Sequence, residues 1–97
     1  MEKSPSPDQV CASFAEGGGR ITIKMLDTEN ILIEGSPTAL EFLGRLLQAQ
    51  AAVPKDCGFQ ISPIGAGNAL FSPSSSLGIY IHRLPCEHRG HLEAVDA

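Results

Sequence analysis

Alternation of apolar and polar residues predicts four short strands along the chain. Alternation with period two, carried by β-branched residues, is typical of strands with one buried face. Runs of this kind occupy residues 20–26, 31–34, 57–61 and 77–84. In the first run Ile21, Ile23 and Met25 share one side. Only the turn-prone segment Asp27–Asn30 separates the first two runs, so we expect them to form an antiparallel hairpin.

A helical pattern lies between the second and third of these runs. Ser36 is a suitable N-cap, because its hydroxyl can accept a hydrogen bond from a backbone N–H of the first turn. Pro37 suits the first helical position, where the N–H that proline lacks would have no partner. Pro54 is expected to end the helix. The apolar positions fill nearly half of the helical wheel around Leu43, which predicts one broad buried face.

The predicted order β-β-α-β-β indicates an α+β fold in two layers, with one amphipathic helix packed on a four-stranded sheet. The expected core comprises Ile21, Ile23, Met25, Ile31, Ile33, Leu40, Leu43, Leu46, Leu47, Phe59, Ile61, Leu77, Ile79 and Ile81. We assign residues 20–84 to this single domain. Residues 1–19, with two Ser-Pro pairs and three consecutive glycines, are expected to be a flexible lead-in, in which residues 10–15 could form a short helix or an edge strand, or stay loose. Residues 85–97 are expected to be a flexible tail.

One helix covers one face of such a sheet, so the opposite face is expected to be open. That face would carry aliphatic, tyrosine and histidine side chains, which suit a partly apolar interface. The predicted partner-binding residues are Leu32, Tyr80, His82 and Leu84, and the Gly-, Pro- and Ser-rich loop over 63–76 is a further contact. We expect the chain to bind a protein partner or a second copy of itself, since open sheet faces and strand edges favour association.

Charge and length exclude several functions. The chain has 97 residues, enough for one small domain, and a net charge of −4 that is carried by residues 1–19 and 85–97. The neutral middle lacks the basic surface that nucleic-acid binding requires. No apolar run is long enough to cross a bilayer, and the first residues lack the apolar stretch of a secretory signal. We therefore expect a cytoplasmic protein that contacts neither nucleic acid nor membrane.

The three cysteines and the histidines offer candidate chemistry. Without a secretory signal, free thiols are expected and a disulfide is not. Cys86, His88 and His91 could bind zinc through sulfur and nitrogen, which makes a small metal-binding module the alternative function. The competing interpretation is a tail that contains these residues by chance. No pattern marks a nucleophile with a base, so we expect neither an enzyme nor a cofactor.

Three segments together resemble the immunity protein 32 family of bacterial polymorphic-toxin systems. They are the strand and turn over 31–37, the leucine-rich helix, and the closing segment over 77–84, so that the resemblance covers about residues 21–84. The family usually has a histidine near the start of the third strand, where this chain has Lys55–Gly58 instead. The resemblance implies a small bacterial cytoplasmic protein that neutralises a toxin by binding it, and it implies no catalytic residue.

Overall fold

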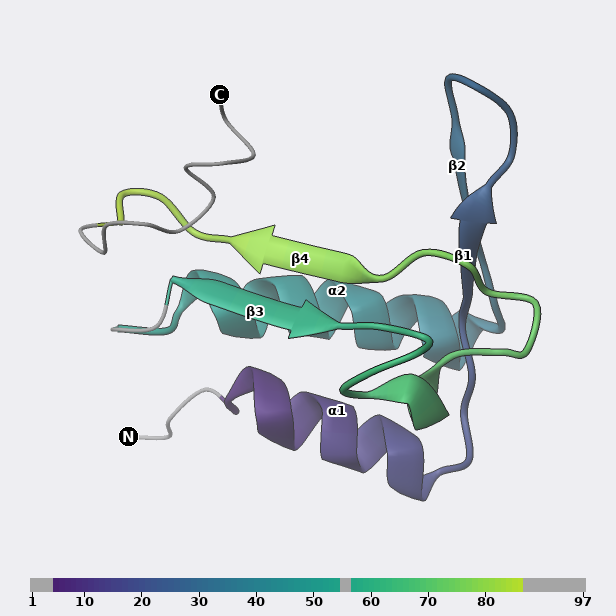
Figure 1. The fold of residues 1–97 in the computed structure, drawn as a ribbon. Helices are drawn as coiled ribbons and strands as arrows, with labels where there is room; N and C mark the ends of the chain where they lie inside the picture. Colours follow the sequence, from purple (N-terminus) through teal and green to yellow (C-terminus); the bar gives the residue numbers. More distant parts are fainter. Residues whose placement is uncertain (1–4, 55–56, 87–97) are drawn as a thin grey trace.

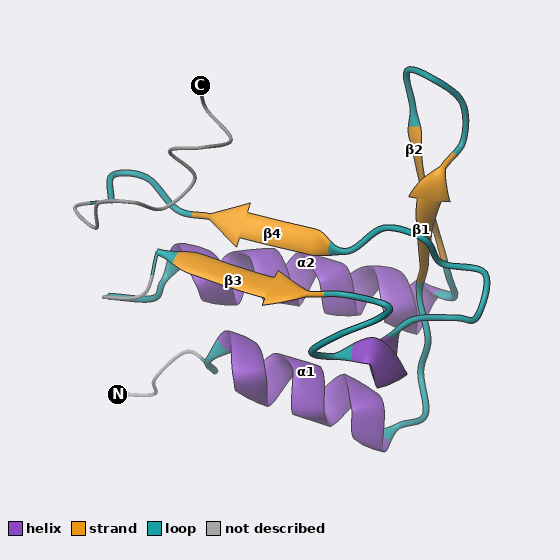
Figure 2. Ribbon diagram, viewed as in Figure 1, coloured by secondary structure: helices purple, strands orange, loops and turns teal. Residues whose placement is uncertain are grey.

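The computed structural model of the chain describes residues 5–54 and 57–86. Over these residues the fold is α+β and contains two α-helices and two separate two-stranded antiparallel sheets (Figures 1 and 2). In chain order the elements are α1 (Pro7–Glu16), β1 (Thr22–Met25), β2 (Ile31–Glu34), α2 (Pro37–Ala51), β3 (Gly58–Ile61), a 3₁₀ turn (Asn68–Leu70) and β4 (Ile79–His82).

The four strands and the long helix confirm the sequence prediction. The Ser36 hydroxyl caps α2 by accepting the Ala39 N–H at 3.2 Å, and Pro37 takes the first helical position. β1 and β2 form the expected antiparallel hairpin, in which Ile23 lies opposite Ile33. The Asp27 carboxylate holds its turn by accepting two backbone N–H groups at 2.8 Å.

The prediction of one four-stranded sheet is wrong. Within the described residues, β1 pairs with β2 and β3 pairs with β4, but no ladder joins the two pairs. The reason is that residues 70–77 occupy the other edge of β1. The Ile21 carbonyl accepts the Ser72 N–H at 2.8 Å, and the Ile23 carbonyl accepts the Ser76 N–H at 3.0 Å. The β1–β2 hairpin therefore stands steeply across the end of α2, away from β3 and β4 (Figure 1).

The prediction of a fold with one helix is also wrong, because residues 7–16 form α1. Ser6 caps this helix in a reciprocal capping box with Gln9, and Pro7 lies in the first turn. The Ser-Pro pair thus begins a helix instead of extended chain. α1 packs against α2 through a parallel stack of Phe14 on Phe42, whose ring centroids are 4.1 Å apart.

The core lies between the two helices, the inner face of β3–β4 and residues 70–71. Ile21, Ile23, Leu46 and Ile61 are buried as expected. Five of the expected core residues are instead at least 44% exposed: Met25, Ile31, Ile33, Leu40 and Leu47. Their places are filled by side chains that were not expected there, namely Val10, Phe14, Leu70 and Phe71. The 63–76 segment, expected to be an exposed loop, therefore contributes to the core.

Candidate functional site

The β1–β2 hairpin exposes an apolar face. Residues directly opposite one another in an antiparallel pair share a face, and neighbours along a strand alternate. The register places Ile23 and Ile33 on one face together with Met25 and Ile31. Ile23 is buried at the base, whereas Met25, Ile31 and Ile33 are 49%, 59% and 44% exposed. We call these three side chains the hairpin face.

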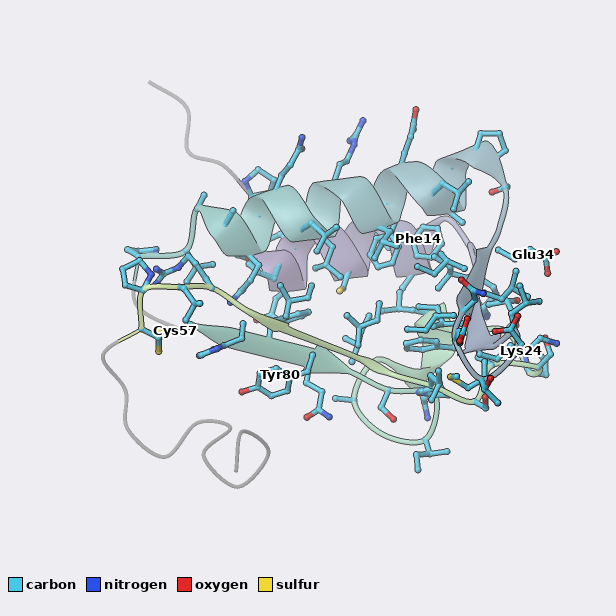
Figure 3. The ribbon with its side chains drawn as sticks, turned by 90° about the horizontal axis from the view of Figure 1, so that it is seen from above. Phe14, Lys24, Glu34, Cys57 and Tyr80 are labelled. Atoms are coloured by element: carbon cyan, nitrogen blue, oxygen red, sulfur yellow. A yellow bond between two sulfur atoms is a disulfide. The ribbon has the colours of Figure 1, made fainter. Side chains whose placement is uncertain are left out.

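The hairpin face lies on the side of the hairpin that looks toward the helices. Lys24 and Glu34 belong to the opposite face, and Figure 3 shows their side chains pointing away from the helices. The alternation then directs Met25, Ile31 and Ile33 the other way. Half-exposed leucines on α2, Leu40 and Leu47, add to the apolar surface outside the core.

The outer edge of β2 is open to pairing. Near the turn, the Leu26 N–H donates to the Asn30 carbonyl at 2.8 Å, which makes this a hydrogen-bonded pair. Such pairs alternate with non-bonded pairs along an antiparallel ladder. The peptide groups of Leu32 therefore face β1, and those of Ile31 and Ile33 face outward. No hydrogen bond joins these outward groups to any part of the chain that the structure describes.

The predicted partner-binding residues are divided between two places. Leu32 lies on β2 and is partly buried, whereas Tyr80, His82 and Leu84 lie on or just after β4. Tyr80 is 42% exposed and Leu84 is 75% exposed. Tyr80 projects from the side of β3–β4 that faces away from the helices (Figure 3). Because the sheets are separate, these four residues do not form one face.

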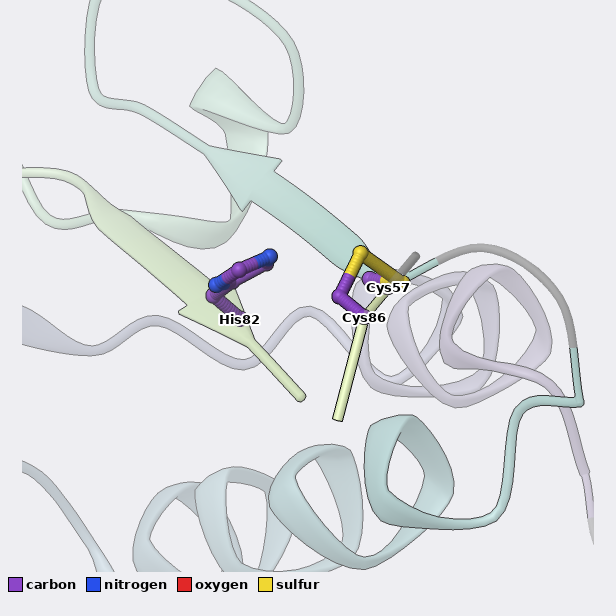
Figure 4. Close-up of side chains that lie close together, drawn as sticks. All are labelled: Cys57, His82 and Cys86. Atoms are coloured by element: carbon purple, nitrogen blue, oxygen red, sulfur yellow. A yellow bond between two sulfur atoms is a disulfide. The ribbon is translucent and has the colours of Figure 1, made fainter. Parts of the chain in front are cut away.

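A second cluster lies at the far end of β3–β4, where Cys57 and Cys86 form a disulfide with a Cα–Cα distance of 5.8 Å. The expectation of free thiols is therefore wrong for this pair. The pairing of β3 with β4 places Gly58 opposite His82, which brings the start of one strand beside the end of the other. Ligand atoms of Cys57, His82 and Cys86 lie within 4.8 Å of one another (Figure 4).

The Cys57 backbone is fixed from two sides. Its carbonyl accepts the Gln50 amide N–H at 2.7 Å and the Arg83 backbone N–H at 2.8 Å. Gln50 on α2 is 1% exposed, and Arg83 directly follows β4. Cys57 is therefore held inside the protein between α2 and the end of β4. The Arg83 guanidinium places Nη2 4.0 Å from the Cys57 sulfur and donates through Nη1 to the Pro85 carbonyl.

The predicted zinc ligands are therefore regrouped. His88 and His91 lie outside the described residues, and Cys86 has Cys57 and His82 as its neighbours instead. The sequence prediction included Cys86, but it missed Cys57, which is 29 residues from Cys86. The signal that could have found Cys57 was the pairing of the two strands that these cysteines flank.

Two further features carry less chemistry. A shallow open groove of about 270 Å³ lies between α1 and α2, with Phe14 and Phe42 on its floor and Glu41 and Arg45 among its lining residues. Cys11 on α1 is a free thiol, and burial together with the nearby Asp8 charge raises its pKa to about 11. A thiol of that pKa is a weak nucleophile at neutral pH, because little thiolate is present.

Comparison of the chain with protein-family models, with curated proteins and with solved structures found no match. Among the described residues, no helix has the length and apolar character needed to cross a membrane.

Proposed function

We propose that this chain is a protein-interaction domain that acts by binding, and that a strand of a partner chain adds to the open edge of β2. The observation that carries this proposal is the outward direction of the Ile31 and Ile33 peptide groups. Strand addition uses such groups for main-chain hydrogen bonds, while alternate side chains provide specificity. The hairpin face would be covered at the same time.

Within the described residues, the edge lacks four common devices against pairing, namely proline, lysine, a bulge and a covering loop. Natural edge strands are protected by proline, by lysine, by bulges or by a covering loop. β2 has the sequence Ile31–Glu34, with no proline or lysine, and its ladder with β1 runs without a bulge. The opposite edge of this small sheet, on β1, is covered by residues 70–77. The contrast supports β2 as a surface kept for a partner.

A second copy of the chain fits this edge. With Leu32 opposite the partner's Leu32 across a two-fold axis, Ile31 lies opposite the partner's Ile33, and the outward peptide groups of both can exchange hydrogen bonds. A row of side chains then crosses the four strands in the order Ile23, Ile33, the partner's Ile31 and the partner's Met25. Each of the two rows that cross the four strands on the hairpin face is aliphatic throughout.

Charge also suits this register. Glu34 lies opposite the partner's Asn30, and the two Glu34 carboxylates are separated by about 13 Å along the strands, which is beyond the screening length of ~8 Å at physiological salt. A shift of the register by two residues would place Leu32 opposite the partner's Glu34 or the partner's Asn30, and only one of the two aliphatic rows would remain complete. We therefore propose a second copy as the occupant of the β2 edge.

The resemblance of residues 21–84 to the immunity protein 32 family supports a different occupant, namely a toxin. A toxin strand would use the same outward peptide groups. The two occupants differ in one measurable property, because only self-pairing makes the mass of the purified chain depend on its concentration.

Sedimentation equilibrium tests the proposal. We expect a monomer–dimer equilibrium for the wild type. Ile31→Pro removes one outward N–H from each copy, and the loss of two hydrogen bonds should weaken association about tenfold or more. Ile64→Lys is the control, because Ile64 is 95% exposed in a turn outside the β1–β2 hairpin, and its association should equal that of the wild type.

Two outcomes would overturn self-pairing: a wild type that stays monomeric at every concentration tested, or equal weakening by both substitutions. A monomeric chain should then be titrated with the product of an adjacent toxin gene. Binding that Ile31→Pro abolishes and Ile64→Lys leaves intact would make the toxin the occupant, and binding that Ile31→Pro leaves intact would overturn the role of the edge.

A further inference from the structure

We propose that reduction of the Cys57–Cys86 disulfide opens a binding site for a thiophilic divalent cation, with Zn²⁺ as the ion that fits best. Its ligands would be the two cysteine thiolates and the imidazole of His82. This site differs from the predicted set of Cys86, His88 and His91, and it does not depend on the proposed function of the hairpin.

The geometry supports this ligand set. With Zn–S bonds of about 2.3 Å and Zn–N bonds of about 2.0 Å, the ligand atoms of a tetrahedral site are roughly 3.5–3.8 Å apart. The sulfur and nitrogen atoms of Cys57, His82 and Cys86 already lie within 4.8 Å of one another. After reduction the two sulfurs must move apart by less than about 2 Å, which side-chain rotation can supply. No strand needs to move.

The backbone around the proposed site is already ordered without a bound metal. Cys57 is 3% exposed, and hydrogen bonds from Gln50 and Arg83 fix its carbonyl. His82 is the last residue of β4, whose ladder with β3 sets its position. Ligands on a fixed backbone lose little freedom on binding, which favours affinity.

The charges are balanced by the ion. Two thiolates beside one another in a partly buried site repel, and a divalent cation neutralises both. The Arg83 guanidinium, with Nη2 4.0 Å from the Cys57 sulfur, favours the thiolate form and can donate to a metal-bound sulfur as an outer partner. Sulfur and imidazole are the donors that zinc prefers, whereas calcium and magnesium require oxygen.

The chemistry has two steps. A dithiol reductant supplies two electrons and two protons, so that the Cys57–Cys86 bond breaks, two thiols form, and the reductant becomes a disulfide. Zn²⁺ then displaces the two thiol protons, which pass to the buffer, and accepts the His82 ring nitrogen as a third ligand. The fourth position is left open to water, as in zinc sites that exchange a ligand. The oxidised chain cannot offer these thiolates, so redox state controls binding.

Titration with Co²⁺, a spectroscopic substitute for Zn²⁺, tests the site. The reduced full chain should bind one ion with a sulfur-to-cobalt charge-transfer band, which Zn²⁺ displaces, and the oxidised chain should show no such band. His82→Gln leaves the disulfide intact and should weaken binding by at least about tenfold. Cys57→Ser should abolish the band.

Matched controls exist for each ligand type. Cys11→Ser removes the thiol that lies on α1, and the double variant His88→Gln/His91→Gln removes the histidines of the original prediction. Both should bind as the wild type does. Circular dichroism before and after Co²⁺ shows whether each reduced variant is folded, and His82→Gln provides the test if the serine variant is not.

Three results would overturn the proposal. They are the absence of stoichiometric uptake by the reduced wild type, equal uptake by the oxidised chain, and unchanged affinity in His82→Gln. None of them bears on association through β2, because the hairpin contains no cysteine or histidine.

Discussion

The two strand pairs, β1–β2 and β3–β4, have strands of equal length, but only β3–β4 packs the whole of its apolar face against the rest of the protein. β3–β4 turns Phe59, Ile61, Ile79 and Ile81 toward the helices, and its far end carries the disulfide. β1–β2 has a comparable aliphatic face, yet it buries Ile23 and leaves the rest half exposed. The comparison teaches that alternation shows which side of a strand is apolar and does not show whether anything covers that side.

The largest expected effect is the difference in stability loss between two substitutions, one of an isoleucine in β3–β4 and one of an isoleucine in β1–β2. Ile61 is 3% exposed, and its side chain fills the space that a Cβ on Gly67 would need. Ile61→Ala should lower the free energy of unfolding by about 2–5 kcal/mol. Ile31→Ala should change it by less than about 0.5 kcal/mol when the chain is dilute enough to be monomeric. Urea denaturation measures the free energy of unfolding of both variants. Equal losses would contradict the conclusion that β3–β4 is packed into the core and that the β1–β2 hairpin face is not.

Reduction of the disulfide is expected to have the next largest effect. The Cys57–Cys86 bond closes a loop with a sequence separation of 29. Loop-closure entropy for a loop of this size predicts a loss of about 3–4 kcal/mol on reduction. Urea denaturation with and without a dithiol, in the presence of a chelator, checks this value. Stability that is insensitive to the dithiol would show that the bond does not constrain the β3–β4 end.

A smaller effect is expected at the clamp between α2 and Cys57. Gln50→Ala removes the buried donor to the Cys57 carbonyl, and the cost should be about 1–3 kcal/mol. Gln48→Ala changes the same side chain at an exposed position of the same helix and should be nearly neutral. If both variants lose the same stability, helix propensity and not the clamp is responsible.

The smallest effect concerns the turn of the β1–β2 hairpin. Hydrogen bonds from the backbone N–H of Glu29 and from Asn30 lower the pKa of Asp27 below its usual 3.8. A lowered pKa in the folded chain means that the carboxylate stabilises the turn above the ordinary value, and that this contribution is lost as pH falls through the folded value. The NMR chemical shift of the Asp27 side-chain carboxyl, followed between about pH 5 and 2, should give a pKa below 3.8. A pKa at or above 3.8 would contradict it.

Much of the local structure could be predicted from the sequence, because its causes are local. Alternation located the strands, and Ser36 with Pro37 located the start of α2. The same reasoning left a short helix as only one of three alternatives for residues 10–15, although Ser6, Pro7 and Gln9 form the same kind of start signal. The apolar stripe of that helix is short, with Val10 and Phe14 as its buried aliphatic and aromatic side chains, so its period was weak.

The separation of the strands into two sheets could not be predicted, because it depends on contacts between residues that are distant in sequence. Residues 70–77 cover the edge of β1 through backbone and serine hydrogen bonds. The Ser75 Oγ, for example, accepts the Ile23 N–H at 3.1 Å. Residues 72–76 of this segment are four serines and one proline, which have no apolar period that would indicate such a role. The cysteine cluster was missed for a related reason, because the β3–β4 register brings Cys57 to Cys86.

Hydrogen exchange of the β2 amides, followed residue by residue over a range of chain concentrations, tests the central claim most directly. The account predicts that the Ile31 and Ile33 N–H groups exchange fast in dilute solution and become protected as concentration rises. The Leu32 N–H, which faces β1, should be protected more uniformly. Ile31 and Ile33 amides that exchange at one rate over the whole range, whether fast or slow, would contradict pairing of a second copy at this edge.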